Sequence, residues 1–252
     1  MSSGNTITAY PAGQGQSQST LGAGKRPNIA TDYTKVECWG DNGKPHLVEY
    51  SGSGKLKGQT AIVTGGASGD TENAKDAKRL IEQSGATCNT VCTDLMDSNA
   101  CKNVVDSHMK AFGKLNVLVN NASKQMTSDK FENIDLHNVE NTFKATSSKF
   151  DFASTEGAIV SFTRSLAVQL MDRGIRVNAV APGPVNAAPQ AGSRTPESIE
   201  ALGAGLGTPL HGRVGQPAEV APSFVFLASS KDSNIVTGQV IHVNSGLQTG
   251  SS

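Results

Sequence analysis

A glycine-rich turn follows a short apolar run in the stretch TAIVTGGASGD, residues 60–70. Small residues at Thr64, Gly65, Gly66 and Gly69 let the backbone approach a ligand closely, and the backbone N–H groups before a helix attract a phosphate. These residue types therefore suit the pyrophosphate of a dinucleotide. A turn of this kind also serves as a purely structural connection between a strand and a helix, and the stretch by itself leaves both interpretations open.

The glycine turn needs a strand before it and a helix after it. The apolar run 61–63 predicts a buried strand, and the helical spacing of apolar residues in 72–84 predicts an amphipathic helix. Similar patterns predict strands over 86–93, 115–119, 175–180 and 239–243, and helices over 98–112, 135–145, 152–172, 197–202 and 217–227. Strands that alternate with helices through short connections indicate an α/β fold whose parallel sheet is covered on both faces.

Several segments fall outside this alternation. Residues 1–54 contain a Gly/Ser/Gln-rich stretch and no sustained apolar period, which predicts an N-terminal tail and linker that is mostly disordered over 1–50. The folded domain is expected over 55–246, and 247–252 are expected to fray. Residues 183–215 are rich in proline and glycine, which predicts a long loop of the kind that covers active sites.

Composition limits the classes of function. The chain carries 22 basic and 22 acidic residues, so its charge gives no argument for binding nucleic acid or an anionic membrane. The first residues lack a signal-peptide pattern, no apolar run is long enough to span a membrane, and we expect a cytoplasmic protein. We also expect no metal site and four reduced cysteines, because the spacing of histidines and cysteines fits neither metal ligands nor disulfides. The cysteines are Cys38, Cys88, Cys92 and Cys101.

Several motifs occur in order along 55–246. The turn TGGASG (64–69) is followed by Asp94-Leu95, by Asn120-Asn121-Ala122, by RVNAVAPGPV (176–185) and by TGQVIHVNSG (237–246). Together these motifs resemble the short-chain dehydrogenase/reductase family. The stretches FASTEGAIVSFTRSLA and GQPAEVAPSFVFLAS resemble its glucose/ribitol dehydrogenase-like branch. The resemblance implies a Rossmann-like doubly wound parallel sheet that binds NAD or NADP.

The resemblance also implies which residues contact the cofactor. They are Thr64, Gly65, Gly66, Gly69, Asp94, Asn121, Pro182 and Gly183. Asp94 has two interpretations: a ribose-binding acid after a second strand, or an adenine-contacting acid after the third strand of the family. We favour the second, because a Cys-containing helix follows the Asp-Leu pair as it does at that place in the family.

The catalytic Tyr-x-x-x-Lys pattern of the family falls on Phe152 and Glu156. In the family the tyrosine passes a proton to or from the substrate oxygen, while the lysine lowers the tyrosine pKa and holds the nicotinamide ribose. Phenylalanine has no titratable proton, and glutamate places an anion where the family has a cation. The nearest counterpart of the catalytic serine is Ser148, displaced from the usual spacing. The resemblance therefore implies a substituted and impaired catalytic site.

Two stretches are shorter than the family pattern. The chain between Asn121 and Phe152 cannot hold the helix, strand and catalytic loop of the family, because a complete crossover takes about 30 residues before that loop is added. After Gly69, Asp70 and Thr71 stand where the family has isoleucine and its third glycine, and a helix and a strand are missing. We therefore expect a sheet that lacks one or two strands and helices relative to the family.

Two functions remain open from the sequence. The first is an NAD(P)-dependent oxidoreductase that acts on a small alcohol or carbonyl substrate, such as a sugar or polyol, and forms a homo-oligomer weakened by a missing interface helix. The second is a non-catalytic relative that binds a nucleotide or a protein, or a truncated product without function. Loss of acid–base catalysis typically costs about 10²–10⁴-fold in rate, so the residues favour the second and the family favours the first.

Overall fold

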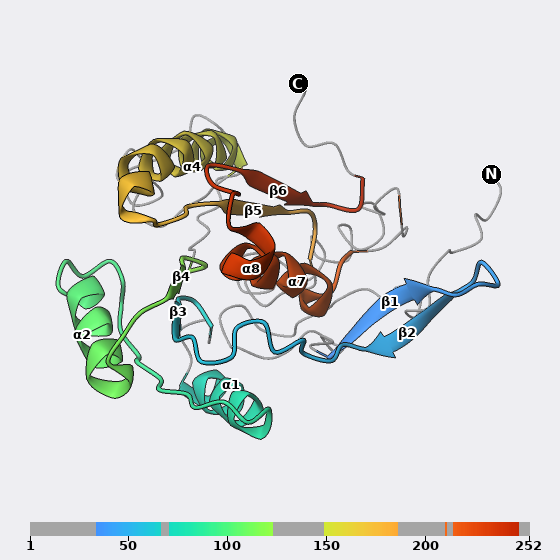
Figure 1. Ribbon diagram of the computed structural model, residues 1–252, viewed down its shortest axis with the longest axis horizontal. Helices are drawn as coiled ribbons and strands as arrows, with labels where there is room; N and C mark the ends of the chain where they lie inside the picture. The colour runs from blue at the N-terminus through green and yellow to red at the C-terminus, as the bar shows by residue number, and fades with distance from the viewer. Residues whose placement is uncertain (1–33, 67–70, 123–148, 186–209, 211–213, 247–252) are drawn as a thin grey trace. The chain divides into compact units, whose positions relative to one another are not determined.

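The computed structural model describes residues 34–66, 71–122, 149–185, 210 and 214–246 (Figure 1). The chain divides into two compact units. One consists of Lys57–Glu156, and the other combines Met1–Leu56 with Gly157–Ser252. The predicted helix 135–145, the predicted helix 197–202 and most of the predicted loop 183–215 lie outside the described residues.

The unit Lys57–Glu156 contains a parallel pair of strands, β3 (Ala61–Val63) and β4 (Val117–Val119). Ile62 on β3 is buried and lies opposite Leu118 on β4. The start of the pair is held by Thr60, whose hydroxyl donates to the Lys114 carbonyl (2.5 Å) and whose amide donates to Asn116 Oδ1 (3.0 Å). The strands predicted at 61–63 and 115–119 therefore form, the second over Val117–Val119. The predicted burial of 61–63 is wrong for two of its three residues, because only Ile62 is buried while Ala61 and Val63 are exposed.

Two helices of this unit also match their predictions. Helix α1 spans Thr71–Gln83 and helix α2 spans Ala100–Phe112, where 72–84 and 98–112 were expected. Helix α2 ends at Gly113, whose φ of 73° belongs to the left-handed region that favours glycine. The buried His108 ring lies 2.9 Å from the Lys114 carbonyl oxygen through Nε2, which fixes the connection from α2 to β4.

The predicted strand over 86–93 is wrong, because the structure has no strand between α1 and α2. Most of this segment is exposed, and Asn89 donates a side-chain hydrogen bond to Ser107 on α2 (3.2 Å). A strand forms only where a neighbouring strand accepts its backbone hydrogen bonds, and no strand among the described residues pairs with this segment. Partial burial raises the pKa of the Cys88 thiol, which favours its protonated form.

The other unit contains a second parallel pair, β5 (Ala179–Pro182) and β6 (Val240–Val243). The long helix α4 (Lys149–Leu170) begins in the first unit, to which its residues 149–156 belong, and continues into the second. It is followed by the 3-10 turn η2 (Met171–Arg173), which ends at Gly174, as the sequence predicts for 152–172. The buried Ala167 of α4 packs beside Gly238, just before β6: a Cβ on that glycine would lie 3.6 Å from the Ala167 Cβ. Helix α7 (Pro217–Ala228) confirms the prediction for 217–227, and the short helix α8 (Ser230–Ser233) follows it.

An N-terminal hairpin corrects the prediction of disorder for residues 35–49, whereas residues 1–33 lie outside the described residues. Strands β1 (Lys35–Trp39) and β2 (Pro45–Glu49) pair antiparallel, with Glu37 opposite Leu47. The Gly/Ser/Gln-rich stretch that suggested disorder ends before the hairpin, and the polar composition of the segment masked the alternation in VECW and HLVE. Strand β1 of the hairpin packs against α7, and the three central residues of β1 are half-buried, whereas β2 is mostly exposed.

Parallel strand pairs and their helices form an α/β Rossmann-like fold, as the sequence predicts. Each parallel pair among the described residues has two strands. In this same part of the chain, no helix is both long enough and apolar enough to cross a membrane. All four cysteines are free thiols.

Candidate cofactor site

Thr64 connects the glycine turn after β3 to the residues that follow β4. Its amide donates to the Val119 carbonyl (3.0 Å), which extends the pairing of the two strands by one step. Its hydroxyl oxygen accepts hydrogen bonds from the amides of Asn121 and Ala122, both at 3.0 Å. The hydroxyl also donates to the Val119 carbonyl at 3.4 Å. One side chain thus holds both strand ends in a fixed relation.

Asn121 strengthens the same connection from the other side. Its side-chain Nδ2 donates to the Thr64 carbonyl oxygen at 3.3 Å. The Asn121 side chain therefore helps to shape the glycine turn, and its predicted contact with the cofactor stays a prediction. Asn121 is exposed, as a residue at the open end of a parallel strand pair can be.

Gly65 is required by the close approach of the two strand ends. A Cβ atom at this position would lie 2.7 Å from the Ala122 Cα and 2.9 Å from the Ala122 nitrogen. The residue also has a φ of +75°, which side chains rarely adopt. Both facts explain why glycine follows Thr64 here.

Gly66 differs from Gly65, because a Cβ atom there would meet nothing within 4 Å. Both glycines are exposed, and neither backbone amide donates a hydrogen bond to any described residue. Exposed, unbonded N–H groups at the carboxyl end of a parallel strand are what a pyrophosphate needs. The described part of the turn therefore fits a dinucleotide, whereas Gly69 lies outside the described residues.

Asp94 lies in a turn between α1 and α2 rather than at the end of a strand. Its Oδ1 accepts a hydrogen bond from the Met96 amide (2.9 Å), and its carbonyl accepts one from the Asp97 amide (3.1 Å). The side chain thus holds its own turn, as aspartate commonly does. Asp94 is exposed, and its predicted contact with an adenine stays a prediction.

Pro182 and Gly183 end strand β5 in the other unit. The Gly183 amide donates to the Val243 carbonyl at the end of β6 (2.9 Å). A Cβ atom on Gly183 would lie 2.8 Å from the Asn244 Cα, so the close pairing of these strand ends requires glycine. The Pro-Gly turn is therefore first of all a packing feature, and its contact with the nicotinamide stays a prediction.

The positions that correspond to the catalytic pair lie on α4. Phe152 and Glu156 are about one helical turn apart along the backbone of helix Lys149–Leu170. Ser148, the third predicted catalytic position, lies outside the described residues. Among the described residues, no cluster of histidine, cysteine and carboxylate side chains could hold a metal ion.

Arg176 and Asn178 support β5 in a way that the motif analysis did not assign. The Arg176 guanidinium donates to the Ser233 hydroxyl (3.0 Å), and Asn178 Nδ2 donates to the Val236 carbonyl (2.9 Å). The Gln239 amide in turn donates to Asn178 Oδ1 (3.0 Å). Two polar residues in the otherwise apolar stretch RVNAVA were the sequence signal for this role, since buried polar groups need partners.

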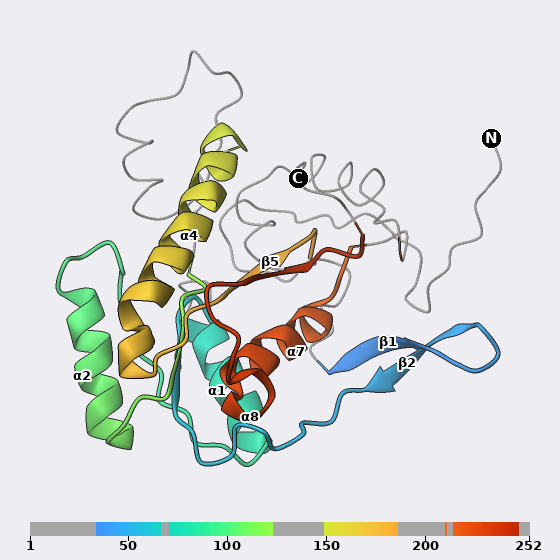
Figure 2. The same ribbon diagram turned by 45° about the horizontal axis from the view of Figure 1, so that its top comes forward.

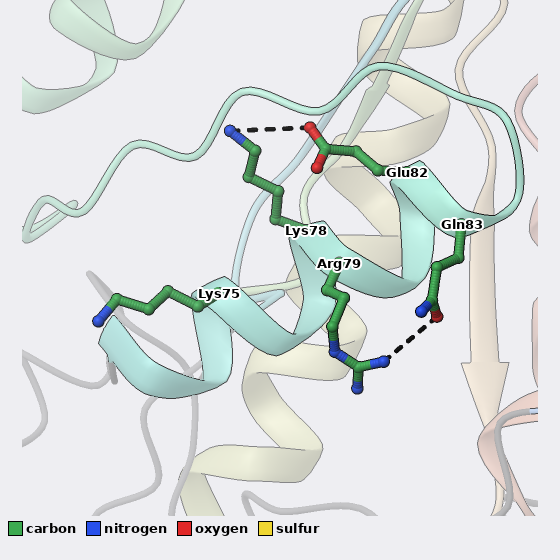
Figure 3. Close-up of a pocket in the computed structure, with 5 residues that line it drawn as sticks. All are labelled: Lys75, Lys78, Arg79, Glu82 and Gln83. Carbon is green, nitrogen blue, oxygen red and sulfur yellow. Dashed lines mark hydrogen bonds and ion pairs between the residues drawn. The ribbon is translucent and has the colours of Figure 1, made fainter.

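A recess on α1 is formed by side chains of that helix alone (Figure 3). Lys78 pairs with Glu82 (3.7 Å) and Arg79 donates to Gln83 (3.2 Å), so these charges interact with each other along the helix surface. One helix face with internally paired charges is typical of a solvated surface. We therefore place the candidate site at the strand ends and not at this recess.

Replacing Thr64 by valine should lower the free energy of unfolding by about 1–3 kcal/mol. The change keeps the shape of the side chain and removes the oxygen that accepts the Asn121 and Ala122 amides, and unpaired polar groups carry a cost of this size. Chemical denaturation measures the loss. The matched control is Thr64→Ser, which keeps the hydroxyl; equal losses in the two variants would contradict the proposed role of the oxygen.

Two family models match successive parts of the chain, which together span residues 58–248. One, described as short chain dehydrogenase, covers residues 58–150, and the other, described as Enoyl-(Acyl carrier protein) reductase, covers residues 145–248. The "Uncharacterized oxidoreductase YhdF" of Bacillus subtilis (strain 168) is 37% identical over 79% of this chain and 86% of its own length. The chain belongs to the short-chain dehydrogenase/reductase family. Members of this family are NAD(P)-dependent oxidoreductases.

Further comparisons agree with this membership. The "Glucose and ribitol dehydrogenase" of Daucus carota is 31% identical over 81% of this chain and 93% of its own length. A Serratia marcescens short-chain dehydrogenase/reductase double mutant has the same fold, with a TM-score of 0.63, 21% identity and coverage of 76% of this chain and 98% of its own. The family and the Rossmann-like fold predicted from the sequence are therefore confirmed.

The alignment to the Bacillus subtilis relative shows that it has residues where this chain has none. The alignment runs over 253 positions, more than the whole 252-residue chain contains, although only 79% of the chain takes part. The relative must therefore have residues at aligned positions that are empty in this chain. The alignment does not say where those positions lie.

Proposed function

We propose that this short-chain dehydrogenase/reductase binds NAD or NADP at the Thr64–Gly66 turn and reduces or oxidises an alcohol or carbonyl with impaired turnover. A sugar or polyol is the substrate class, because a relative of this chain is named for glucose and ribitol. The bound nicotinamide would donate or accept the hydride. The protein must then hold the cofactor, orient the substrate and transfer one proton.

The cofactor-holding part of this task has support in the described residues. The exposed amides of Gly65 and Gly66 can donate to a pyrophosphate, and the Thr64 hydroxyl fixes the turn that presents them. Asn121 holds the same turn through its side chain. These contacts do not depend on the catalytic positions, so binding can survive where catalysis is lost.

The proton-transfer part carries the proposal of impairment. Position 152 is phenylalanine, which cannot donate or accept a proton, and position 156 is glutamate, which cannot replace a lysine cation. Both positions lie on helix α4. The substitution of both groups is the single observation on which the impaired turnover rests.

Cofactor titration tests the proposal. NADH or NADPH fluorescence should change saturably when the chain is added, and turnover of glucose, ribitol or a simple aldehyde should be slow. Thr64→Val serves as the variant with a disturbed turn and should weaken the binding. Rapid turnover by the unmodified chain would overturn the impairment, and the absence of any saturable signal would overturn the binding.

The aligned positions that this chain lacks favour an alternative in which the protein catalyses nothing. Without the segments that complete the site, this chain would either bind a nucleotide or a protein without catalysis or be a truncated product without function. Thermal melting separates these cases. Saturable cofactor binding with a cooperative melt and no turnover at all would indicate the non-catalytic binder, and a broad melt without binding would indicate the truncated product.

A further inference from the structure

We propose that residues 35–55 form a strap that is fastened across the α7–α8 helix pair, with Glu219 and Asp232 as its two fastening points. Figures 1 and 2 show the start of β1 beside the first turn of α7, and the chain after β2 running back toward α8. The strap and both helices belong to the same compact unit.

The first fastening point joins the free edge of β1 to the start of α7. Bonds from the Tyr50 amide to the Thr34 carbonyl and from the Gly40 amide to the Lys44 carbonyl place the even-numbered residues of β1 in the bonded pairs of the hairpin. The Glu37 amide therefore points away from β2, at the outer edge of the hairpin. That amide donates to Glu219 Oε1 at 3.4 Å.

The same Glu219 carboxylate also caps helix α7. Its Oε2 accepts the Gln216 amide at 2.8 Å, and the Gln216 side chain accepts from the backbone of the first turn, which completes a capping box. The Glu219 carboxylate thus caps the helix with Oε2 and accepts the hairpin amide with Oε1. A residue that only capped the helix would need only the contact with the Gln216 amide.

The second fastening point lies at the far end of the strap. Lys55 Nζ lies 3.2 Å from Asp232 Oδ2 on α8. The neighbouring Ser229 side chain, followed by the Lys55 ammonium, holds the pKa of Asp232 below its ordinary value. The ion pair is partly exposed and will weaken in salt.

The two helices under the strap are firmly joined to the rest of their unit. The buried Ser233 hydroxyl lies within 2.8 Å of the Phe226 carbonyl near the end of α7, and Arg176 donates to Ser233. At the other end, the Gly215 amide donates to the Pro184 carbonyl just after β5 (2.8 Å). A strap fastened at both ends of the α7–α8 pair therefore restrains two helices whose ends are connected by hydrogen bonds to the segments on either side of β5.

Hydrogen exchange on the full chain tests the first fastening point. Glu219→Ala should speed the exchange of β1 amides roughly tenfold, because it removes a charge-assisted contact of the hairpin as well as the cap. The matched control is Gln216→Ala, which disturbs the same capping box and leaves Glu219 beside β1. Unchanged β1 exchange in Glu219→Ala, or equal acceleration in Gln216→Ala, would show that Glu219 is only a cap and would overturn the proposal.

Limited trypsin digestion tests the second fastening point and does not depend on how Glu219 variants fold. Trypsin cleaves after Lys55 and after Lys57, and the structure pairs Lys55 with Asp232. Asp232→Ala should raise cleavage after Lys55, relative to cleavage after Lys57, by several-fold. Asp172→Ala removes the same charge from an exposed site on η2 and should leave the ratio unchanged. An unchanged ratio in Asp232→Ala would overturn the strap at this end.

Discussion

Replacing Phe152 by tyrosine and Glu156 by lysine in one chain should raise oxidoreductase turnover by about 10²–10⁴-fold, the usual contribution of acid–base catalysis. The tyrosine restores a titratable hydroxyl, and the lysine restores a cation that lowers its pKa. The two positions lie about one turn apart along α4. Steady-state oxidation of NADH or NADPH with an aldehyde or sugar measures the gain.

Single variants and a displaced tyrosine control this experiment. Phe152→Tyr alone should gain much less, because Glu156 would raise the tyrosine pKa instead of lowering it. Phe162→Tyr adds the same hydroxyl to an exposed position of the same helix and should gain nothing. If the double variant binds the cofactor like the parent chain and shows the parent's turnover, the impairment does not lie at these two positions.

Gly65→Ala should destabilise the protein more than the addition of a methyl group at any other described position of the glycine turn. We expect it to lower the free energy of unfolding by about 2–4 kcal/mol. The left-handed φ of +75° disfavours alanine, and the new Cβ would overlap the Ala122 backbone at 2.7 Å. Backbone atoms cannot rotate away as a side chain does, so the two strand ends would have to separate. Denaturant unfolding measures the loss.

Gly66→Ala is the matched control, one residue further along the same turn. Its Cβ would meet nothing within 4 Å, and its φ lies outside the left-handed region, so stability should change by less than about 1 kcal/mol. If Gly65→Ala were as stable as Gly66→Ala, the close approach of the two strand ends would not be a constraint in solution.

The sequence predicted most helices because helices depend on local patterns. Helix α1 and helix α2 lie within two residues of their predicted bounds, and Gly113 ends α2 as expected. The strand prediction over 86–93 failed because a strand also needs a neighbour, which no local pattern contains. The hairpin at Lys35–Glu49 was missed for a related reason, since β1 packs against α7, which lies far along the chain.

The candidate site shows the same division. The motifs identified Thr64, Gly65 and Asn121 as members of one site, but the sequence could not show that the Thr64 hydroxyl joins them. It could not separate Gly65 from Gly66 either. The separation depends on Ala122, which comes close only because β3 and β4 pair in parallel.

The family, the α/β class and the absence of a proton donor at position 152 could be read from the residues, because they depend on residue identities and on their order. The folded structure was needed to show which glycine is required and which residues fasten the N-terminal hairpin. Those properties depend on distances between segments far apart in the chain, such as Glu37 and Glu219. Residue types set the chemistry that is available, and pairing of distant strands and helices decides which groups meet.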